Sequence, residues 1–138
     1  MSTRSVIEKY MNHMFNGDFI AAFEMFAADG KYTIIGDTPI SGTYIGPDHI
    51  KRDLVGLLAG RFISPPVVSC TEIIVENDRG VALGFGDGPA KFGHYKQSYY
   101  AFVFKIDGEQ VKEMVEFMDP TQLSMNCFGQ TLSEPLPA

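Results

Sequence analysis

Apolar residues recur at helical spacing at three places in the first half of the chain, whereas the second half alternates with the period of strands. This pattern predicts a helix over residues 3–16, a second helix after Asp18, and a third from Pro47 to about Gly60. Asp18 suits an N-cap, and Pro47 suits the first turn of a helix. The apolar face of the second predicted helix consists of Phe19, Ala22, Phe23 and Phe26.

Period-two alternation and turn residues predict the strands. The predicted strands cover residues 31–35 and then, as a meander, 67–76, 80–86, 95–106 and 110–119. Helices followed by a strongly twisted, mostly antiparallel sheet form an α+β architecture. Because the concave face of such a sheet must be buried against helices, the pattern favours one apolar cavity, which would be the default ligand site.

The charge balance argues against two classes of partner. The chain has 11 Lys and Arg, 17 Asp and Glu, and a net charge of -6 at pH 7. Its basic residues are scattered, so we expect no binding to nucleic acid, which requires clustered positive charge. No apolar run approaches the roughly 18 residues that span a bilayer, and the N-terminus lacks the apolar core of a signal peptide. We therefore expect a cytoplasmic protein with no membrane partner.

The few cysteines and histidines give no support for a metal site. Cys70 and Cys127 are too far apart in the sequence for a short metal-binding motif. Two buried, reduced thiols are expected, although the spacing leaves a disulfide open. His13, His49 and His94 form no HxxxH pair, so we expect neither a metal nor another cofactor.

Several short motifs follow one another in a recognisable order. Residues 10–18 end in Asn-Gly-Asp, residues 26–32 read FAADGKY, residues 41–46 read SGTYIG, and residues 99–119 form a closing pair of strands. Together these motifs resemble the SnoaL-like and ketosteroid-isomerase-like branches of the nuclear transport factor 2-like superfamily. The resemblance extends over about residues 6–119.

This resemblance implies a particular arrangement of the predicted elements. Three N-terminal helices would pack on a strongly curved, mostly antiparallel sheet, and the resulting cone would enclose an apolar cavity. Residues 1–119 would form a single SnoaL-like domain. Residues 120–138 would form a C-terminal tail that is partly disordered or packed on a dimer partner.

The catalytic residues of the ketosteroid isomerases are only partly present. Tyr10 falls where those enzymes carry a tyrosine that donates a hydrogen bond to a developing oxyanion. Ile34 falls at the position of the general base, and Phe102 falls at or beside the second acid. Since alkyl and phenyl side chains carry no acidic proton, the resemblance does not extend to isomerase chemistry of that type.

Glu116, on the last predicted strand, is the remaining candidate for proton transfer. Met114, Glu116 and Met118 share one face of the strand. Both faces mix polar and apolar residues, so alternation alone does not decide which face lies inside, and it is the resemblance that places Glu116 in the cavity. Desolvation there would raise its pKa and suit it to act as an acid or base. An acid at this position is catalytic in the limonene epoxide hydrolase branch, but the accompanying Arg and Asp are not evident in residues 85–88.

The resemblance implies a protein that binds a small hydrophobic molecule, either carbonyl-bearing or polycyclic. Glu116 would carry a proton, and Tyr10 would be its hydroxyl partner. The alternative is a non-catalytic ligand-binding or assembly module, because one fold of this kind hosts many functions. Asp37, in a turn, is predicted at the mouth of the cavity. The full set of predicted ligand-binding residues is Met14, Tyr32, Ile34, Asp37, Leu54, Phe85, Phe102, Met114 and Met118.

A homodimer is expected through the outer face of the sheet. Simple alternation places Tyr95, Gln97 and Tyr99 on the face opposite Tyr100 and Phe102. In proteins of this type the outer sheet face is often a dimer interface, and amphipathic aromatic side chains suit that role.

Overall fold

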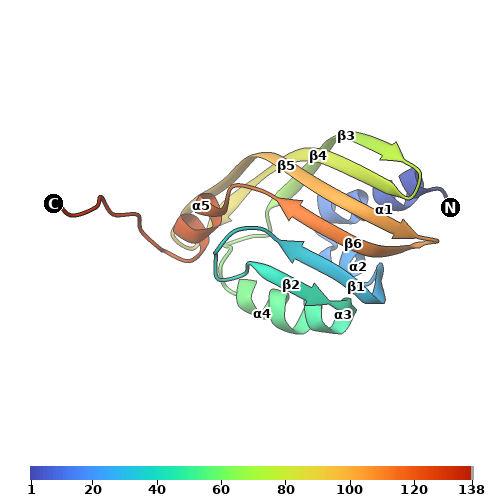
Figure 1. Ribbon diagram of the computed structural model, residues 1–138. Coiled ribbons are helices and arrows are strands. Elements are labelled where there is room, and N and C mark those ends of the chain that lie inside the picture. The colour runs from blue at the N-terminus through green and yellow to red at the C-terminus, as the bar shows by residue number, and fades with distance from the viewer. Residues whose placement is uncertain (138) are drawn as a thin grey trace.

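The computed structural model describes residues 1–137 and contains a six-stranded sheet with helices on one side (Figure 1). The helical segments are α1 (Thr3–Phe15), α2 (Phe19–Phe23), α3 (Gly46–His49), η1 (Ile50–Leu54), α4 (Val55–Leu58), α5 (Pro120–Gln122) and η2 (Leu123–Cys127). The strands are β1 (Phe26–Ile34), β2 (Gly42–Ile45), β3 (Val67–Glu76), β4 (Arg79–Ala90), β5 (Gly93–Asp107) and β6 (Gln110–Phe117).

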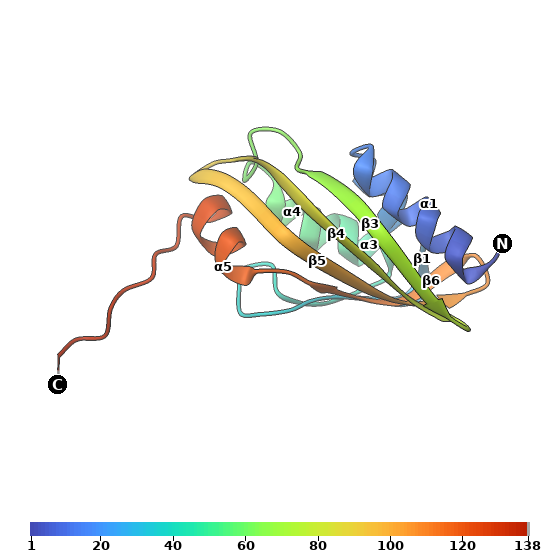
Figure 2. The ribbon, with the colours of Figure 1, turned by 90° about the horizontal axis from the view of Figure 1, so that it is seen from above.

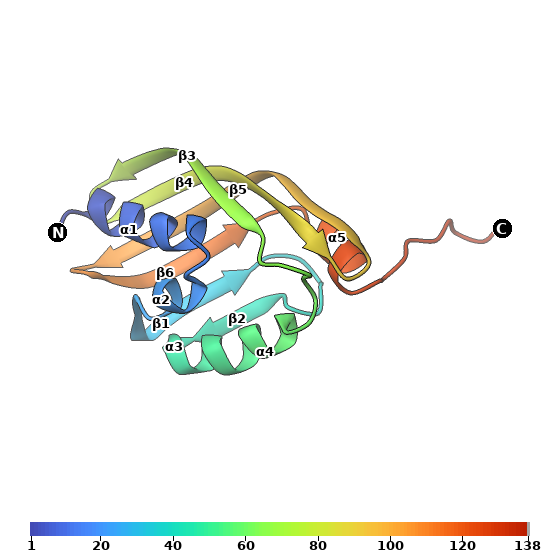
Figure 3. The same cartoon turned by 180° about the vertical axis from the view of Figure 1, so that it is seen from behind.

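The sheet is curved and mixed, with strand order β2-β1-β6-β5-β4-β3. All neighbouring strands are antiparallel except β1 and β6, which run parallel. α1 and α2 cover the face of the sheet that is turned to the viewer in Figure 3, and the segment from α3 to α4 runs along the β2 edge of the sheet. The predicted third helix is therefore one helical stretch that changes from α to π and back to α.

Local signals in the sequence explain where the helices begin and end. The Ser2 hydroxyl caps α1 by accepting the Ser5 N–H. Gly17, with φ of 77°, ends it in a left-handed conformation that glycine adopts without strain. The helix buries one stripe against the sheet, consisting of Val6, Ile7, Tyr10, Met11 and Met14.

Phe26 corrects the predicted extent of the second helix, because it is the first residue of β1. The Val111 N–H donates to the Met25 carbonyl, and Phe26 pairs with Val111 in the parallel ladder. A short apolar run suits a helix or a strand equally, so the partner strand decides between them.

The pairing of β4 with β5 contains a β-bulge that changes which side chains lie inside. Gly84 pairs with Tyr100, but Gly86 pairs with Gln97, so Ser98 and Tyr99 together face one residue of β4. The extra residue reverses the alternation of β5 at this point.

The bulge corrects part of the predicted outer face. Tyr95 and Gln97 are buried, on the same face as Tyr100 and Phe102. Tyr99 alone of the predicted three lies on the outer face, with 86% of its surface exposed.

The residues that follow β6 fold back onto the same chain. α5 and η2 contact β5, and Leu123 and Cys127 are buried. From above, α5 lies at the end of the sheet farthest from the N-terminus, and the chain after η2 extends away from it (Figure 2). None of the helices in residues 1–137 has the length and apolarity needed to cross a membrane.

Candidate functional site

A pocket of about 760 Å³ opens between the helices and the concave face of the sheet. Its walls come from the α1–α2 junction, from η1 and α4, from residues 59 and 62–66, and from inward-facing residues of β1, β5 and β6. Most of the lining is apolar, including Phe23, Leu54 and Phe62. The volume lies within the range of pockets that bind small molecules.

Six of the eleven site residues predicted from the sequence line the pocket, and the other five lie elsewhere. The six lining residues are Met14, Tyr32, Ile34, Leu54, Glu116 and Met118. Phe102 and Met114 are fully buried in the core beside the pocket. Asp37 is exposed in the turn after β1, and Tyr10, on the buried face of α1, lies in the core.

Phe85, predicted as a wall residue, is 48% exposed on the outer face of β4. The neighbouring inward-facing positions on this strand, Gly84 and Gly86, have no side chain. A Cβ atom on Gly84 would collide with the carbonyl oxygen of Ser69 on β3. The backbone of β3 therefore lies too close for a residue larger than glycine at position 84. Phe85, the next residue along the strand, points to the opposite face.

Glu116 lies on the inner face of β6, where alternation alone could not place it. It pairs with Ile34 of β1 on one side and with Phe102 of β5 on the other. Oε1 of Glu116 accepts a hydrogen bond of 2.8 Å from the hydroxyl of Tyr32. Burial raises the pKa of Glu116 to about 7, and the bond from Tyr32 acts in the opposite direction.

Tyr32 is held in place by other aromatic rings. Its ring stacks on Phe26, with centroids 5.6 Å apart, and contacts Phe23 and Tyr44. Burial raises the pKa of Tyr32 well above its usual value, and the charge of Glu116 adds to the shift. The phenol therefore keeps its proton and remains a hydrogen-bond donor to the carboxyl group.

The Tyr10 hydroxyl has no hydrogen-bond partner within residues 1–137, and its atoms are fully buried. The ring packs edge-on against Phe104 and Phe26, at centroid distances of 5.2 and 6.0 Å. Burial, followed by the charge of Glu116, raises its pKa. Tyr10 is therefore a core residue near the carboxyl group but not part of the lining.

Two tyrosines that the sequence pattern did not assign to the site also line the pocket. The hydroxyls of Tyr95 and Tyr100 form a short hydrogen bond with each other. Tyr95 also packs edge-on against Phe62, with centroids 5.3 Å apart. Burial raises the pKa of both phenols, so both remain protonated. Simple alternation does not predict this pair, because residues at an odd spacing along a strand face opposite sides of the sheet. Only the β-bulge puts both tyrosines on one face.

Gln97 fixes the end of β6 near the pocket. Its side-chain oxygen accepts the Asp119 N–H at 2.7 Å, and its amide nitrogen donates to the Asp119 carbonyl at 2.8 Å. These two bonds continue the sheet after the last strand pair. They place Met118 at the pocket wall, where its sulfur lies 3.6 Å from the Gln97 amide nitrogen.

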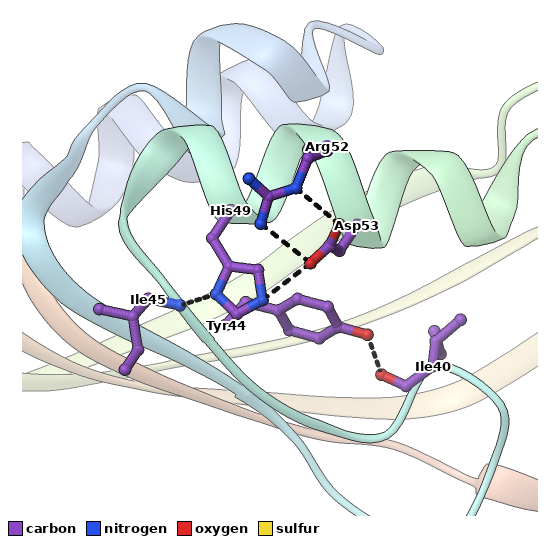
Figure 4. A network of polar contacts seen from close by, with 6 residues as sticks. All are labelled: Ile40, Tyr44, Ile45, His49, Arg52 and Asp53. Atoms are coloured by element: carbon purple, nitrogen blue, oxygen red, sulfur yellow. Dashed lines mark hydrogen bonds and ion pairs between the residues drawn. The ribbon is translucent and has the colours of Figure 1, made fainter.

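A second polar cluster, at the start of the long helical stretch, is fully engaged in structural bonds (Figure 4). Nδ1 of His49 accepts the Ile45 N–H at 2.8 Å, so the proton of the neutral ring lies on Nε2, 3.1 Å from Asp53. Arg52 binds the same carboxylate with two nitrogens. Both histidine nitrogens are occupied, so the cluster ties the helix to β2. In the described part of the chain, no three His, Cys, Asp or Glu side chains gather as a metal site would require.

Comparison with solved structures confirms the predicted nuclear transport factor 2-like fold. A nuclear transport factor 2-like protein from Burkholderia thailandensis has a TM-score of 0.80 and 16% identity, over 91% of this chain and 97% of that one. A phenazine biosynthesis-related protein from Pseudomonas aeruginosa has a TM-score of 0.73 and 19% identity, over 96% and 85%. A protein with a ketosteroid isomerase-like fold from Catenulispora acidiphila, in complex with trimethylamine, has a TM-score of 0.71 and 17% identity, over 89% and 92%.

The chain therefore has the nuclear transport factor 2-like fold, in its ketosteroid isomerase-like form. No model of a known protein family matches the sequence. No curated protein matches it either.

Proposed function

We propose that this protein binds a small hydrophobic molecule, carbonyl-bearing or polycyclic, in the pocket and that Glu116 transfers a proton to or from it. The observation that supports this proposal is a nearly buried carboxyl group, with a pKa of about 7, in the wall of an apolar pocket. A group that titrates near neutrality is suited to act as both acid and base. The chemistry would need no cofactor and would be of the cyclase, isomerase, dehydratase or hydrolase type.

The side chains around Glu116 suit such a transfer. Tyr32 binds Oε1, and no hydrogen bond within residues 1–137 reaches Oε2, which is free to accept a proton from the ligand. In the Tyr95–Tyr100 pair, one hydroxyl proton is used between the two oxygens and the other remains available. That second proton could stabilise negative charge that develops on a carbonyl oxygen of the ligand.

The neighbour from Pseudomonas aeruginosa supports the choice of a polycyclic ligand. That protein is related to phenazine biosynthesis, and phenazines are flat, three-ring aromatic molecules. The pocket walls of this chain contain the rings of Phe23, Phe62 and Tyr100, which suit contact with a flat ring system.

Replacing Glu116 with glutamine tests the catalytic part of the proposal. Glutamine keeps the shape and can still accept the Tyr32 hydrogen bond, but it cannot exchange a proton. For any substrate found in a panel of cyclisation, isomerisation, dehydration and epoxide-opening reactions, kcat should fall by at least about 100-fold. Glu113→Gln, on the same strand but facing outward, is the matched control. Equal turnover by the Glu116→Gln variant and the parent protein would exclude Glu116 as the proton carrier.

The alternative function is ligand binding without chemistry. It is favoured by the position of Tyr10, whose hydroxyl lies in the core and does not line the pocket. An enzyme of the isomerase type would be expected to present that hydroxyl to its ligand. Tight binding of a ligand that the parent protein does not convert would support this alternative.

We also propose that the protein is a homodimer through the outer face of the sheet. Phe85, Tyr99 and Phe117 are 48%, 86% and 45% exposed on the neighbouring strands β4, β5 and β6. Figure 1 shows this face, which is turned away from α1 and α2. A row of exposed aromatic side chains is typical of a surface that binds another protein.

Tyr99→Glu should therefore convert the dimer to a monomer in light scattering coupled to size-exclusion chromatography. A charge at the centre of the face would be buried without a partner in the dimer. Phe15→Glu, which changes an exposed aromatic residue at the end of α1, should leave the dimer intact. A parent protein that is already monomeric, or a Tyr99→Glu variant that remains dimeric, would contradict the proposed interface.

A further inference from the structure

The charged side chains that line the pocket all carry carboxyl groups. Its lining contains three carboxyl groups, those of Asp18, Glu24 and Glu116, and no Lys, Arg or His. Lys51 neutralises Glu24 from outside the lining, at 3.2 Å. No ion pair within residues 1–137 involves Asp18 or Glu116. The carboxyl groups of Asp18 at the mouth and Glu116 in the interior therefore have no cation paired with them in this part of the chain.

Glu116 is the more informative of these groups, because it is 8% exposed. A buried carboxylate is stable only when it is paired or well hydrogen-bonded. Tyr32 binds one of its oxygens, whereas Oε2 receives no hydrogen bond from residues 1–137. The side chain lines the pocket, so a ligand can reach this oxygen.

Aromatic groups near the carboxyl would stabilise a cation further. Phe23, Tyr32 and Tyr100 all line the pocket. The face of an aromatic ring attracts an ammonium ion, most strongly where water is excluded. An anion in the same place would meet aromatic side chains and a carboxyl group, and the lining offers it no basic side chain.

We infer that the ligand of this pocket carries a basic nitrogen, which is protonated when bound and whose ammonium group pairs with Oε2 of Glu116. This inference rests on the proposed function in taking the same pocket as the ligand site, and it names the chemical class of the ligand. Hydrophobic amines are favoured, neutral molecules of the same shape bind more weakly, and carboxylates and phosphates are excluded.

The tyrosines and the cysteine near Glu116 stay neutral around neutral pH. Tyr10 on α1, Tyr32 on β1, and Tyr95 and Tyr100 on β5 have raised pKa values and remain neutral. Burial also raises the pKa of Cys127, on η2, to about 11. Asp18 and Glu24 lie at the mouth, on or next to α2, and Lys51 faces Glu24 from η1.

Affinity for an amine should therefore follow the ionisation of Glu116. With a pKa of about 7, the ionised fraction rises about tenfold between pH 6 and pH 8. A ligand ammonium remains charged over this range. Amine affinity should then increase by about the same factor, whereas affinity for a neutral analogue should change little.

Three probes of one shape test the inference: naphthylmethylamine, naphthylmethanol and naphthoic acid, all substituted at the same ring position. Binding is measured by calorimetry and naphthalene fluorescence at pH 6 and pH 8. At pH 8 the amine should bind at least about tenfold more tightly than the alcohol, and the acid should bind least. Glu116→Gln should remove both the preference for the amine and its pH dependence, and Glu113→Gln should change neither.

The outcomes separate this inference from the proposed function. If the alcohol binds as tightly as the amine, or if the acid binds best, the inference is wrong while the pocket remains a ligand site. The inference is also wrong if Glu116→Gln keeps the preference for the amine. If none of the three probes binds up to its solubility limit, the inference and the proposed ligand site both fail.

Discussion

The Glu116→Gln variant is expected to be more stable than the parent protein at about pH 8, by about 3 kcal/mol, and to match it near pH 4. Glu116 is nearly buried, and burial raises its pKa from 4.5 to about 7. Each unit of difference between folded and unfolded pKa corresponds to about 1.4 kcal/mol of stability. The parent protein must bury a negative charge above neutral pH, and the variant does not.

The sign of this effect follows from which state binds the proton more tightly. The folded protein holds the proton of Glu116 up to about pH 7, whereas the unfolded chain loses it near its ordinary pKa of 4.5. The stability that this group contributes is therefore complete below pH 4.5 and is lost as the pH rises through 7. Other carboxyl groups add their own pH dependence, but they are the same in both proteins.

Urea unfolding followed by circular dichroism, at pH values from 4 to 8, measures the difference. The two free energies of unfolding should diverge as the pH rises. Glu113→Gln should follow the parent protein at every pH. Parallel curves for the parent protein and Glu116→Gln would show that Glu116 titrates at its ordinary value, and the case for proton transfer by this residue would be lost.

A gain of stability on removing Glu116 would also bear on function. Residues that destabilise a fold are concentrated at functional sites, where activity requires them in spite of the loss of stability. An added hydrophobic amine should reduce the difference between the two proteins, because it would pair with the carboxylate of the parent protein alone.

Much of the fold could be predicted from the sequence, because the decisive signals are local. Periodicity and turn residues placed α1 and the four long strands β3, β4, β5 and β6 within a few residues of their observed positions. The sequence pattern favours a helix at Phe26, because the pairing of this residue with β6, far along the chain, has no local signal. The sequence does not predict the parallel pairing of β1 with β6 for the same reason.

The site was harder to predict, since it depends on which face of each strand is buried. Alternation on β6 fitted either face for Glu116, and only resemblance to other proteins placed it inside. On β5 the bulge at Ser98 and Tyr99 shifts the alternation by one residue. A shift of this kind moves Tyr95 from the outer face to the pocket and creates its contact with Tyr100.

The inner face of β4 carried a signal in its sequence that points to close packing. Gly80, Ala82, Gly84, Gly86 and Gly88 alternate with larger residues and are all buried. Strands seldom carry so many small residues on one face unless another part of the backbone or a helix lies close above them. Here a Cβ on Gly80 would meet the side chain of Ile7 on α1, and one on Gly84 would meet the backbone of β3.

Gly84→Ala should therefore destabilise the protein by about 3 kcal/mol and lower its Tm by roughly 10 °C, although it adds only one methyl group. The added carbon would overlap the carbonyl oxygen of Ser69, a backbone atom held in the ladder between β3 and β4. Gly56→Ala is the matched control, because a Cβ on this residue of α4 would meet nothing within 4 Å.

The control should be neutral or stabilising by up to about 1 kcal/mol, since alanine favours helix more than glycine does. Thermal and urea unfolding of the two variants measure the contrast. A loss of less than about 1 kcal/mol in Gly84→Ala would mean that β3 moves aside without cost. The close approach of the two strands would then not be what requires glycine at position 84.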